Sequence, residues 1–302
     1  MSALGAGSMT PPVIIIGMHR SGTSLLTRVL QQSGLFMGLG ASRNEEAAFT
    51  NAVNAWLFRQ ASACWDQPEP VDDLFADEAL WPWLVDYVSG VTNGPASVRF
   101  LGLRRWLRAR GFAGMNEPWG WKDPRNTWTL PLWLTLFPEA RVLHIVRHGV
   151  DVAASLRVRR ERAMADNIER YRRRRQWYVA SPFAPKRRGL GPQPRCRTLA
   201  GGFALWELYV ARARMHIAAH AERSLEVRYE DLLAAPRDEL DRALRFCGCH
   251  PGQTVVEQTA ARFDTGRAHA WQHEPELVEF ADAVGDRLRA QGYSQREAGC
   301  DD

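Results

Sequence analysis

The strongest constraint on the fold is a short apolar run near the N-terminus that leads directly into a glycine-flanked loop and a helical pattern. Val13–Ile16 is continuous and apolar, as expected for a strand buried on both faces of a parallel sheet. The loop runs from Gly17 to Gly22, and Ser24–Ser33 repeats its apolar residues at helical spacing. Because backbone N–H groups and a helix N-terminus converge on such a loop, the segment predicts an anion-binding site.

This loop differs from the loops that bind ATP or GTP. After Gly22 the chain continues Thr23-Ser24, where a nucleoside-triphosphate loop has lysine followed by serine or threonine. A cation, Arg20, lies inside the loop instead. The combination indicates a phosphate-like ligand other than ATP.

Strand-like and helix-like segments alternate along the rest of the chain. This pattern predicts an α/β fold, a P-loop-containing three-layer structure with a central parallel sheet flanked by helices. We expect a flexible leader over residues 1–12, a single domain over 13–290 and a tail over 291–302. Residues 64–120, rich in tryptophan and proline, predict short helices and loops. Further strands are expected at Arg141–Val146 and Leu225–Tyr229, and further helices at Asn44–Ser62, 198–222 and Leu232–Phe246.

A second anion site is predicted after the strand Arg141–Val146. Arg147 follows this strand directly, and Ser155 lies eight positions further on, inside a helical pattern. Because the carboxyl ends of neighbouring parallel strands share one crevice, both residues could bind a second phosphate beside the first. Alternatively, Arg147 pairs with Asp151 or Glu139, and Ser155 is a small helix-packing residue.

Together these motifs resemble the sulfotransferases that use 3′-phosphoadenosine 5′-phosphosulfate, especially the bacterial-type branch. Arg20–Ser24 is similar to the Arg/Lys-Ser-Gly-Thr-Thr/Ser loop that binds the 5′-phosphosulfate in that family. Arg147 and Ser155 match the arginine and serine that bind the 3′-phosphate. Trp121–Pro124 is similar to the Lys-x-Pro element, and Glu226–Leu233 to the Val-x-Tyr-Glu-Asp-Leu element.

The resemblance implies a set of cofactor-binding residues and no metal. The implied cofactor is 3′-phosphoadenosine 5′-phosphosulfate, with 3′-phosphoadenosine 5′-phosphate as the product, and the sequence offers no carboxylate pair that stands out as a magnesium site. Arg267, in a stretch where the family often has another basic residue, could approach the 3′ end, although a solvated helix arginine is the alternative. The implied cofactor-binding residues are His19, Arg20, Ser21, Gly22, Thr23, Ser24, Arg147, Ser155, Tyr229 and Arg267.

The catalytic residues implied by the resemblance are Arg20, Lys122 and Glu45. Sulfuryl transfer resembles phosphoryl transfer, so the leaving phosphate and the three equatorial oxygens need positive charge and hydrogen-bond donors. Arg20 can neutralise the leaving phosphate, and Lys122 or the loop amides can contact the oxygens. Glu45 is the choice for the general base and Glu46 its close rival, unless both merely charge the first turn of a helix opened by Asn44.

Nine arginines lie between Arg157 and Arg175, and they continue into a loop rich in proline, glycine and arginine. This stretch is a solvated helix face or an electropositive wall for an anionic ligand, and residues 157–200 are expected to form an acceptor-side insertion. No module for reading or stacking nucleic-acid bases accompanies it, so nucleic acid is not an expected partner.

The composition favours anionic partners and cysteines that are in the reduced, thiol form. The net charge is +5, and the five cysteines match neither a disulfide framework nor a zinc site. No apolar run is long enough to span a membrane and no signal peptide is recognised, so we expect a cytoplasmic protein. The acceptor is a small molecule, glycan or lipid with a hydroxyl or amine. A P-loop small-molecule kinase and a non-catalytic nucleotide-binding protein are the alternative functions.

Overall fold

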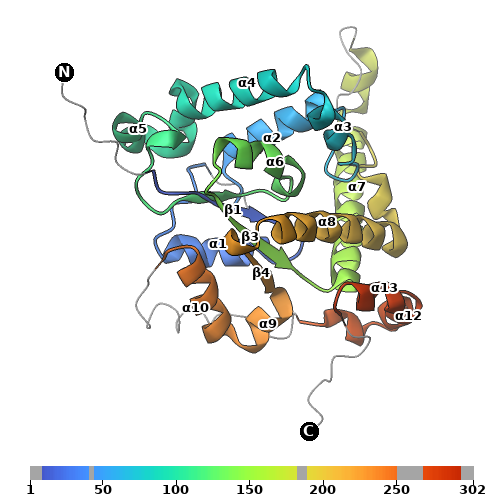
Figure 1. Ribbon diagram of the computed structural model, residues 1–302. Coiled ribbons are helices and arrows are strands. Elements are labelled where there is room, and N and C mark those ends of the chain that lie inside the picture. Colours follow the sequence, from blue (N-terminus) through green and yellow to red (C-terminus); the bar gives the residue numbers. More distant parts are fainter. Residues whose placement is uncertain (1–8, 41–43, 182–188, 250–267, 294–302) are drawn as a thin grey trace, which may run out of the picture. The chain divides into compact units, whose positions relative to one another are not determined.

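The computed structural model describes residues 9–40, 44–181, 189–249 and 268–293 (Figure 1). The chain forms two compact units. The first comprises Met1–Val146 and Tyr209–Ala268, and the second comprises Arg147–Leu208 and His269–Asp302. The single domain expected over residues 13–290 stays a prediction, as do the leader and the tail.

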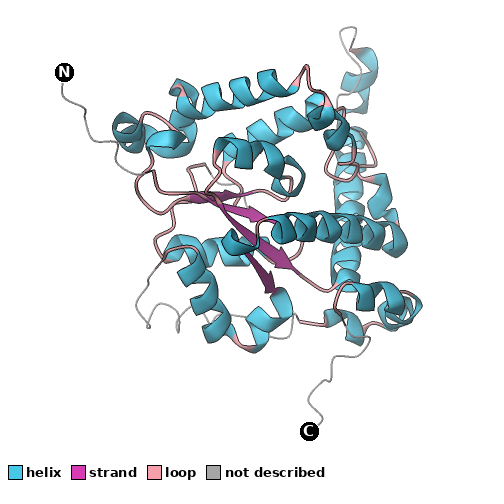
Figure 2. Ribbon diagram, in the orientation of Figure 1, coloured by secondary structure: helices cyan, strands magenta, loops and turns pink. Residues whose placement is uncertain are grey.

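A four-stranded parallel sheet forms the centre of the first unit (Figure 2). The strands are β1 (Val13–Ile16), β2 (Gly120–Lys122), β3 (Arg141–Val146) and β4 (Ser224–Arg228), and their order is β2-β1-β3-β4. Within the sheet, Ile15 of β1 pairs with Lys122 on one side and Leu143 on the other. Because all pairs are parallel, the loops that follow the strands leave from the same edge of the sheet.

The two faces of the sheet bury different sets of helices. Ile14 and Ile16 belong to a core shared with α2 and α6, whereas Val13 and Ile15 belong to a core shared with α1 and α10. Figure 1 shows α2 and α6 on one side of the strands and α1 and α10 on the other. This arrangement confirms the predicted three-layer α/β fold with a central parallel sheet.

The helices of the first unit follow the sequence pattern with three corrections. The helix expected from Asn44 begins only at Ala48, because the backbone reverses at Glu45, whose φ is +59°. The helix expected over Leu232–Phe246 is divided at Pro236, which begins the second of two helices. Residues 64–120 also hold longer helices than expected. The bounds are α1 Thr23–Gln32, α2 Ala48–Gln60, α3 Pro70–Ala76, α4 Trp81–Asn93, α5 Val98–Ala109, α6 Asn126–Leu136, α9 Tyr229–Ala234 and α10 Pro236–Phe246.

The second unit is built around the long helix α7 (Gly149–Ala180), which carries the arginine-rich stretch. Its N-terminal turn packs closely against α8 (Leu199–Ala219), a helix that supplies residues to both units; a Cβ on Gly149 would lie 2.6 Å from the Trp206 ring. Trp206 also donates a hydrogen bond to the carbonyl of Arg147 at 3.0 Å. Two further helices, α12 (Pro275–Ala283) and α13 (Gly285–Ala290), complete the described part of this unit. None of the helices in the described ranges has the length and apolar character to cross a membrane.

Candidate active site

The glycine-flanked loop is anchored at its first residue. Gly17 has a φ of +129° and donates its N–H to Oγ1 of Thr127 in α6 at 3.0 Å. A Cβ at this position would lie 2.5 Å from the carbonyl oxygen of Ile145 in β3, so only glycine fits between the two strands. The carbonyl of Thr127 in turn lies 3.0 Å from Nε2 of His216 in α8. Burial and the nearby Arg212 lower the pKa of His216 to about 4, so the ring is neutral at pH 7 and donates to that carbonyl.

Two residues of the loop, Arg20 and Ser21, have features that suit the binding of an anion. Arg20 is exposed and has a φ of +72°, a left-handed conformation that few non-glycine residues adopt. Ser21 is completely buried, and among the described residues its Oγ has no hydrogen-bond partner. A buried hydroxyl without a partner is costly, so an anion that accepts its hydrogen bond fits this position.

Gly22 begins α1 and lies against the ring of Tyr229. Its φ is +87°, and a Cβ on it would lie 2.3 Å from Cδ2 of Tyr229. Tyr229 is buried and is the first residue of α9, immediately after β4. The structure therefore brings the predicted loop and the predicted tyrosine into direct contact. Thr23 and Ser24 are the first two residues of α1. Their backbone N–H groups point out of the N-terminal end of the helix, beside Gly22, and have no intrahelical acceptors.

Lys122 ends β2, the strand beside β1, and its ammonium group is almost completely buried. Its Nζ donates to the carbonyl of Asn44 at 2.8 Å and to Oε1 of Glu46 at 3.1 Å. Ser24 Oγ donates to the same Asn44 carbonyl at 2.8 Å. The segment that follows the loop helix is thus tied both to α1 and to the end of β2.

The two candidate glutamates have different surroundings. Glu46 is paired with Lys122, and its side chain is 11% exposed. Glu45, which sequence analysis favoured, has a more exposed side chain, and its closest described cation is Arg28 at 3.8 Å. The positive φ of Glu45 turns the chain so that the neighbouring Glu46 meets the lysine.

A buried polar network centred on Asn54 lies next to the end of β2. It was not among the site residues predicted from the sequence. Asn54 of α2 donates to Asp123 at 3.0 Å and to Asn126 at 2.7 Å, and its Oδ1 accepts hydrogen bonds from Thr129 and Trp133. The sequence gives no local signal for this network, because the partners of Asn54 lie 69 to 79 residues away. The network fixes Asp123, the residue next to Lys122.

His19 lies within the loop, and His144 lies beside its first residue, Gly17. The His19 ring packs edge-on against Trp65 with the centroids 4.5 Å apart. His144 is completely buried in β3, as expected for a packed residue, and its Nδ1 lies 2.9 Å from Oε2 of Glu226 in β4. Glu226 also accepts a hydrogen bond from Arg214 at 2.9 Å. Burial opposes ionisation, but His144 and Arg214 outweigh it and lower the pKa of Glu226 to about 2.

The predicted 3′-phosphate residues lie in the second unit. Arg147 Nη2 lies 3.1 Å from Oδ2 of Asp151, which is the ion pair that the sequence left open as an alternative. Burial raises the pKa of Asp151, while Arg147 and the backbone N–H of Trp271 act in the opposite direction. Ser155 lies two turns into α7 and is partly buried. Arg267 lies outside the described residues.

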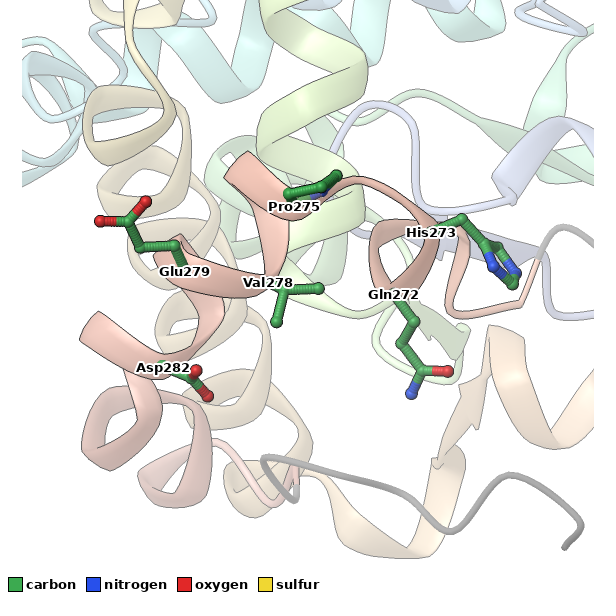
Figure 3. A pocket seen from close by; sticks show the side chains of 6 residues that line it. All are labelled: Gln272, His273, Pro275, Val278, Glu279 and Asp282. Carbon is green, nitrogen blue, oxygen red and sulfur yellow. The ribbon is translucent and has the colours of Figure 1, made fainter.

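A surface depression of about 400 Å³ lies on the second unit and contains none of the predicted site residues (Figure 3). It is lined by Gln272, His273, Pro275, Val278, Glu279 and Asp282. Within the described ranges, no cluster of histidine, cysteine or acidic side chains could hold a metal ion.

The fold and the loop define an α/β protein with a glycine-flanked loop at the carboxyl edge of a parallel sheet. The model of the sulfotransferase family matches residues 11–251, and the chain belongs to that family. This confirms the family resemblance that the motifs indicated.

Solved structures of sulfotransferases are similar to this chain at low sequence identity. The enzyme from Alicyclobacillus acidocaldarius is 17% identical with a TM-score of 0.46, covering 94% of this chain and 96% of that one. The sulfotransferase domain from the curacin biosynthetic pathway is 16% identical with a TM-score of 0.46, covering 92% and 98%. STF9 from Mycobacterium avium is 15% identical with a TM-score of 0.45, covering 91% and 77%. No curated protein matches the chain.

Proposed function

We propose that this sulfotransferase transfers the sulfonate of 3′-phosphoadenosine 5′-phosphosulfate to a hydroxyl or amine acceptor, with 3′-phosphoadenosine 5′-phosphate as the product. Family membership supports sulfonate transfer. The observation that carries the choice of donor is the loop itself. Its buried Ser21 hydroxyl, its N-terminal helix amides and the Lys122 ammonium of the adjacent strand all suit an anion, while the lysine of an ATP loop is replaced by Thr23.

In this proposal the residues of the first unit hold the phosphosulfate end. Ser21, Gly22, Thr23 and Ser24 bind the 5′-phosphate through backbone amides and hydroxyls, and Tyr229 adjoins the adenine. Arg20 neutralises the charge that develops on the leaving phosphate. Lys122 donates a hydrogen bond to a sulfonate oxygen and so stabilises the charge spread over the three equatorial oxygens.

A glutamate accepts the proton of the acceptor. Glu45 and Glu46 were both candidates. The pairing of Glu46 with Lys122 favours Glu46, because the base must lie close to the sulfonate that Lys122 contacts in this proposal and that the acceptor attacks. Replacing each in turn by glutamine tests the choice. Loss of turnover in Glu46→Gln with normal turnover in Glu45→Gln is expected, and the reverse pattern would return the role to Glu45.

The remaining cofactor contacts stay proposals from the family motifs. Arg147 and Ser155 bind the 3′-phosphate, His19 adjoins the loop, and Arg267 approaches the 3′ end. We also keep the acceptor as a small molecule, glycan or lipid, with residues 157–200 on the acceptor side. No metal takes part in the proposed reaction, and a cytoplasmic location stays a prediction.

Ligand-dependent thermal stability tests the choice of donor. A ligand at one hundred times its Kd stabilises the folded state by about 2.7 kcal/mol. We expect 3′-phosphoadenosine 5′-phosphate to raise the Tm and ATP with Mg²⁺ to leave it unchanged, with Arg20→Ala losing the effect and the nearby exposed Arg28→Ala retaining it. Stabilisation by ATP with Mg²⁺ alone would favour a kinase. Binding of the bisphosphate without release of product from the phosphosulfate, over a panel of acceptors, would favour a non-catalytic protein.

A further inference from the structure

Both carboxylate oxygens of Glu46 have a defined partner. Oε1 accepts a hydrogen bond from Lys122 at 3.1 Å, and Oε2 accepts one from Nδ2 of Asn51 at 2.9 Å. Lys122 comes from β2 and Asn51 from the first turn of α2, so the carboxylate is held from two elements. One partner is charged and lies at the strand end, whereas the other is a neutral amide on a helix.

Asn51 is itself held by the turn that follows β2. Arg125 donates from Nη2 to the carbonyl of Asn51 at 3.1 Å, and the same guanidinium nitrogen lies 2.9 Å from Asp123. Asp123 follows Lys122 directly in the chain. The five residues Lys122, Glu46, Asn51, Arg125 and Asp123 therefore close a ring that joins the start of α2 to the end of β2.

This ring can keep Glu46 in position when, in the proposed reaction, its hydrogen bond from Lys122 is weakened. Lys122 is shared between Glu46 and, in the proposed mechanism, a sulfonate oxygen. When the ammonium turns toward the sulfonate, its hydrogen bond to Glu46 weakens. A poorly solvated carboxylate that loses a hydrogen-bond donor does not keep its orientation unless a second donor holds it. Asn51 supplies a second donor that does not depend on the ligand.

We propose that Asn51 is a positioning residue that holds Oε2 of Glu46, so that Oε1 keeps its orientation when Lys122 engages the sulfonate. This inference rests on the proposed function. In the step itself, the acceptor O–H gives its proton to Oε1 of Glu46 while the acceptor oxygen forms a bond to sulfur. The bond between sulfur and the phosphate oxygen breaks, and its electron pair leaves with the phosphate.

A spectroscopic experiment tests the contact without an acceptor. The chain contains only two lysines, Lys122 and Lys186, so lysine labelled with ¹³C and ¹⁵N at the side-chain end gives two signals, and Lys186→Arg assigns them. We expect Asn51→Ala to shift the Lys122 signal because the carboxylate it contacts is released. Asn93→Ala is the matched control, since Asn93 is also a hydrogen-bonded helix asparagine of the first unit, with Ser89 and Ala113 as its partners. An unchanged Lys122 signal in Asn51→Ala overturns the inference.

A kinetic experiment then tests the consequence for catalysis. We measure release of 3′-phosphoadenosine 5′-phosphate from the phosphosulfate with simple phenols as probe acceptors. Misplacement of a reacting group costs up to about 100-fold in rate, and we expect kcat in Asn51→Ala to fall by about 10- to 100-fold with the donor KM changed less than about twofold. In the Glu46→Gln background the same substitution should have no further effect, because Asn51 acts only through Glu46.

The outcomes separate the inference from the proposed function. A fall in kcat that persists at full size in the Glu46→Gln background, or a rise in KM alone, overturns the positioning role. A shifted Lys122 signal together with a wild-type protein that never releases the bisphosphate shows that the contact exists while the proposed function has failed.

Discussion

At the scale of single residues, the loop depends on backbone conformations that only certain side chains allow. Gly22 has a φ of +87° and leaves no room for a Cβ beside Tyr229. Gly34, just after the same helix, has a φ of +95° and has nothing within 4 Å of the Cβ position. Both glycines therefore have the positive φ that other residues rarely adopt. Only at Gly22 would a Cβ also clash with a neighbouring side chain.

We predict that Gly22→Ala weakens binding of 3′-phosphoadenosine 5′-phosphate by more than tenfold, while Gly34→Ala leaves it unchanged. Both variants should lose stability, since a side chain at positive φ costs about 1–2 kcal/mol. In Gly22→Ala the new methyl group must also displace Tyr229 and move the loop. Isothermal titration with the bisphosphate measures the affinities. Equal affinities in the two variants would show that the ring contact at Gly22 does not shape the site.

Arg147 carries a second residue-scale prediction, on discrimination between nucleotides. Replacing Arg147 by alanine should weaken 3′-phosphoadenosine 5′-phosphate more than adenosine 5′-monophosphate, because only the first ligand has the 3′-phosphate. The substitution also removes the partner of Asp151, whose pKa burial already raises, so Asp151→Asn is made in the same background to keep the unit folded. The ratio of the two Kd values is the measurement. Equal weakening of both nucleotides would remove Arg147 from the 3′-phosphate site.

At the scale of elements, the sequence predicted those features that depend on neighbouring residues. The apolar runs before Gly17 and Arg147 predicted β1 and β3, because a strand buried on both faces needs no partner to be recognised. Which glutamate meets Lys122 was not predictable, because a single reversal at Glu45 decides it and Lys122 lies 76 residues from Glu46. The start of α2 was misplaced for the same reason.

The contact of α2 with α6 and with the turn between β2 and α6 carries the element-scale prediction. Asn54 is completely buried and forms hydrogen bonds to one side chain of that turn and three of α6. Asn54→Ala removes these four hydrogen bonds and leaves the buried Trp133 N–H without its described acceptor, so the free energy of unfolding should fall by about 2–5 kcal/mol. Urea denaturation followed by tryptophan fluorescence measures it. Asn93→Ala in α4 is the control and should lose less than about 1 kcal/mol; a comparable loss in both variants would contradict the role of the network.

At the scale of the whole molecule, a buried histidine and a half-buried glutamate of the first unit make stability depend on pH. His216 has a folded pKa of about 4 against an ordinary value of 6.5, so the folded state favours its neutral form. Glu226 has a folded pKa of about 2 against an ordinary value of 4.5, so the folded state favours its ionised form. In both cases the unfolded chain binds the proton more readily, and acid therefore favours unfolding.

The two groups act in successive pH ranges. The contribution of His216 is complete above pH 6.5 and is lost as the pH falls from 6.5 to about 4, whereas that of Glu226 is complete above 4.5 and is lost between 4.5 and about 2. Each pKa shift corresponds to at most about 3.5 kcal/mol of stability. We predict that His216→Gln flattens the upper part of the curve of unfolding free energy against pH and Glu226→Gln the lower part.

Glu276→Gln is the control, because Glu276 pairs with Arg157 on the surface, where solvent screens the interaction. Urea denaturation at pH steps from 7 to 2.5 gives these curves, and a His216→Gln curve parallel to that of the wild type between pH 6.5 and 4 would show that burial and Arg212 do not hold His216 neutral.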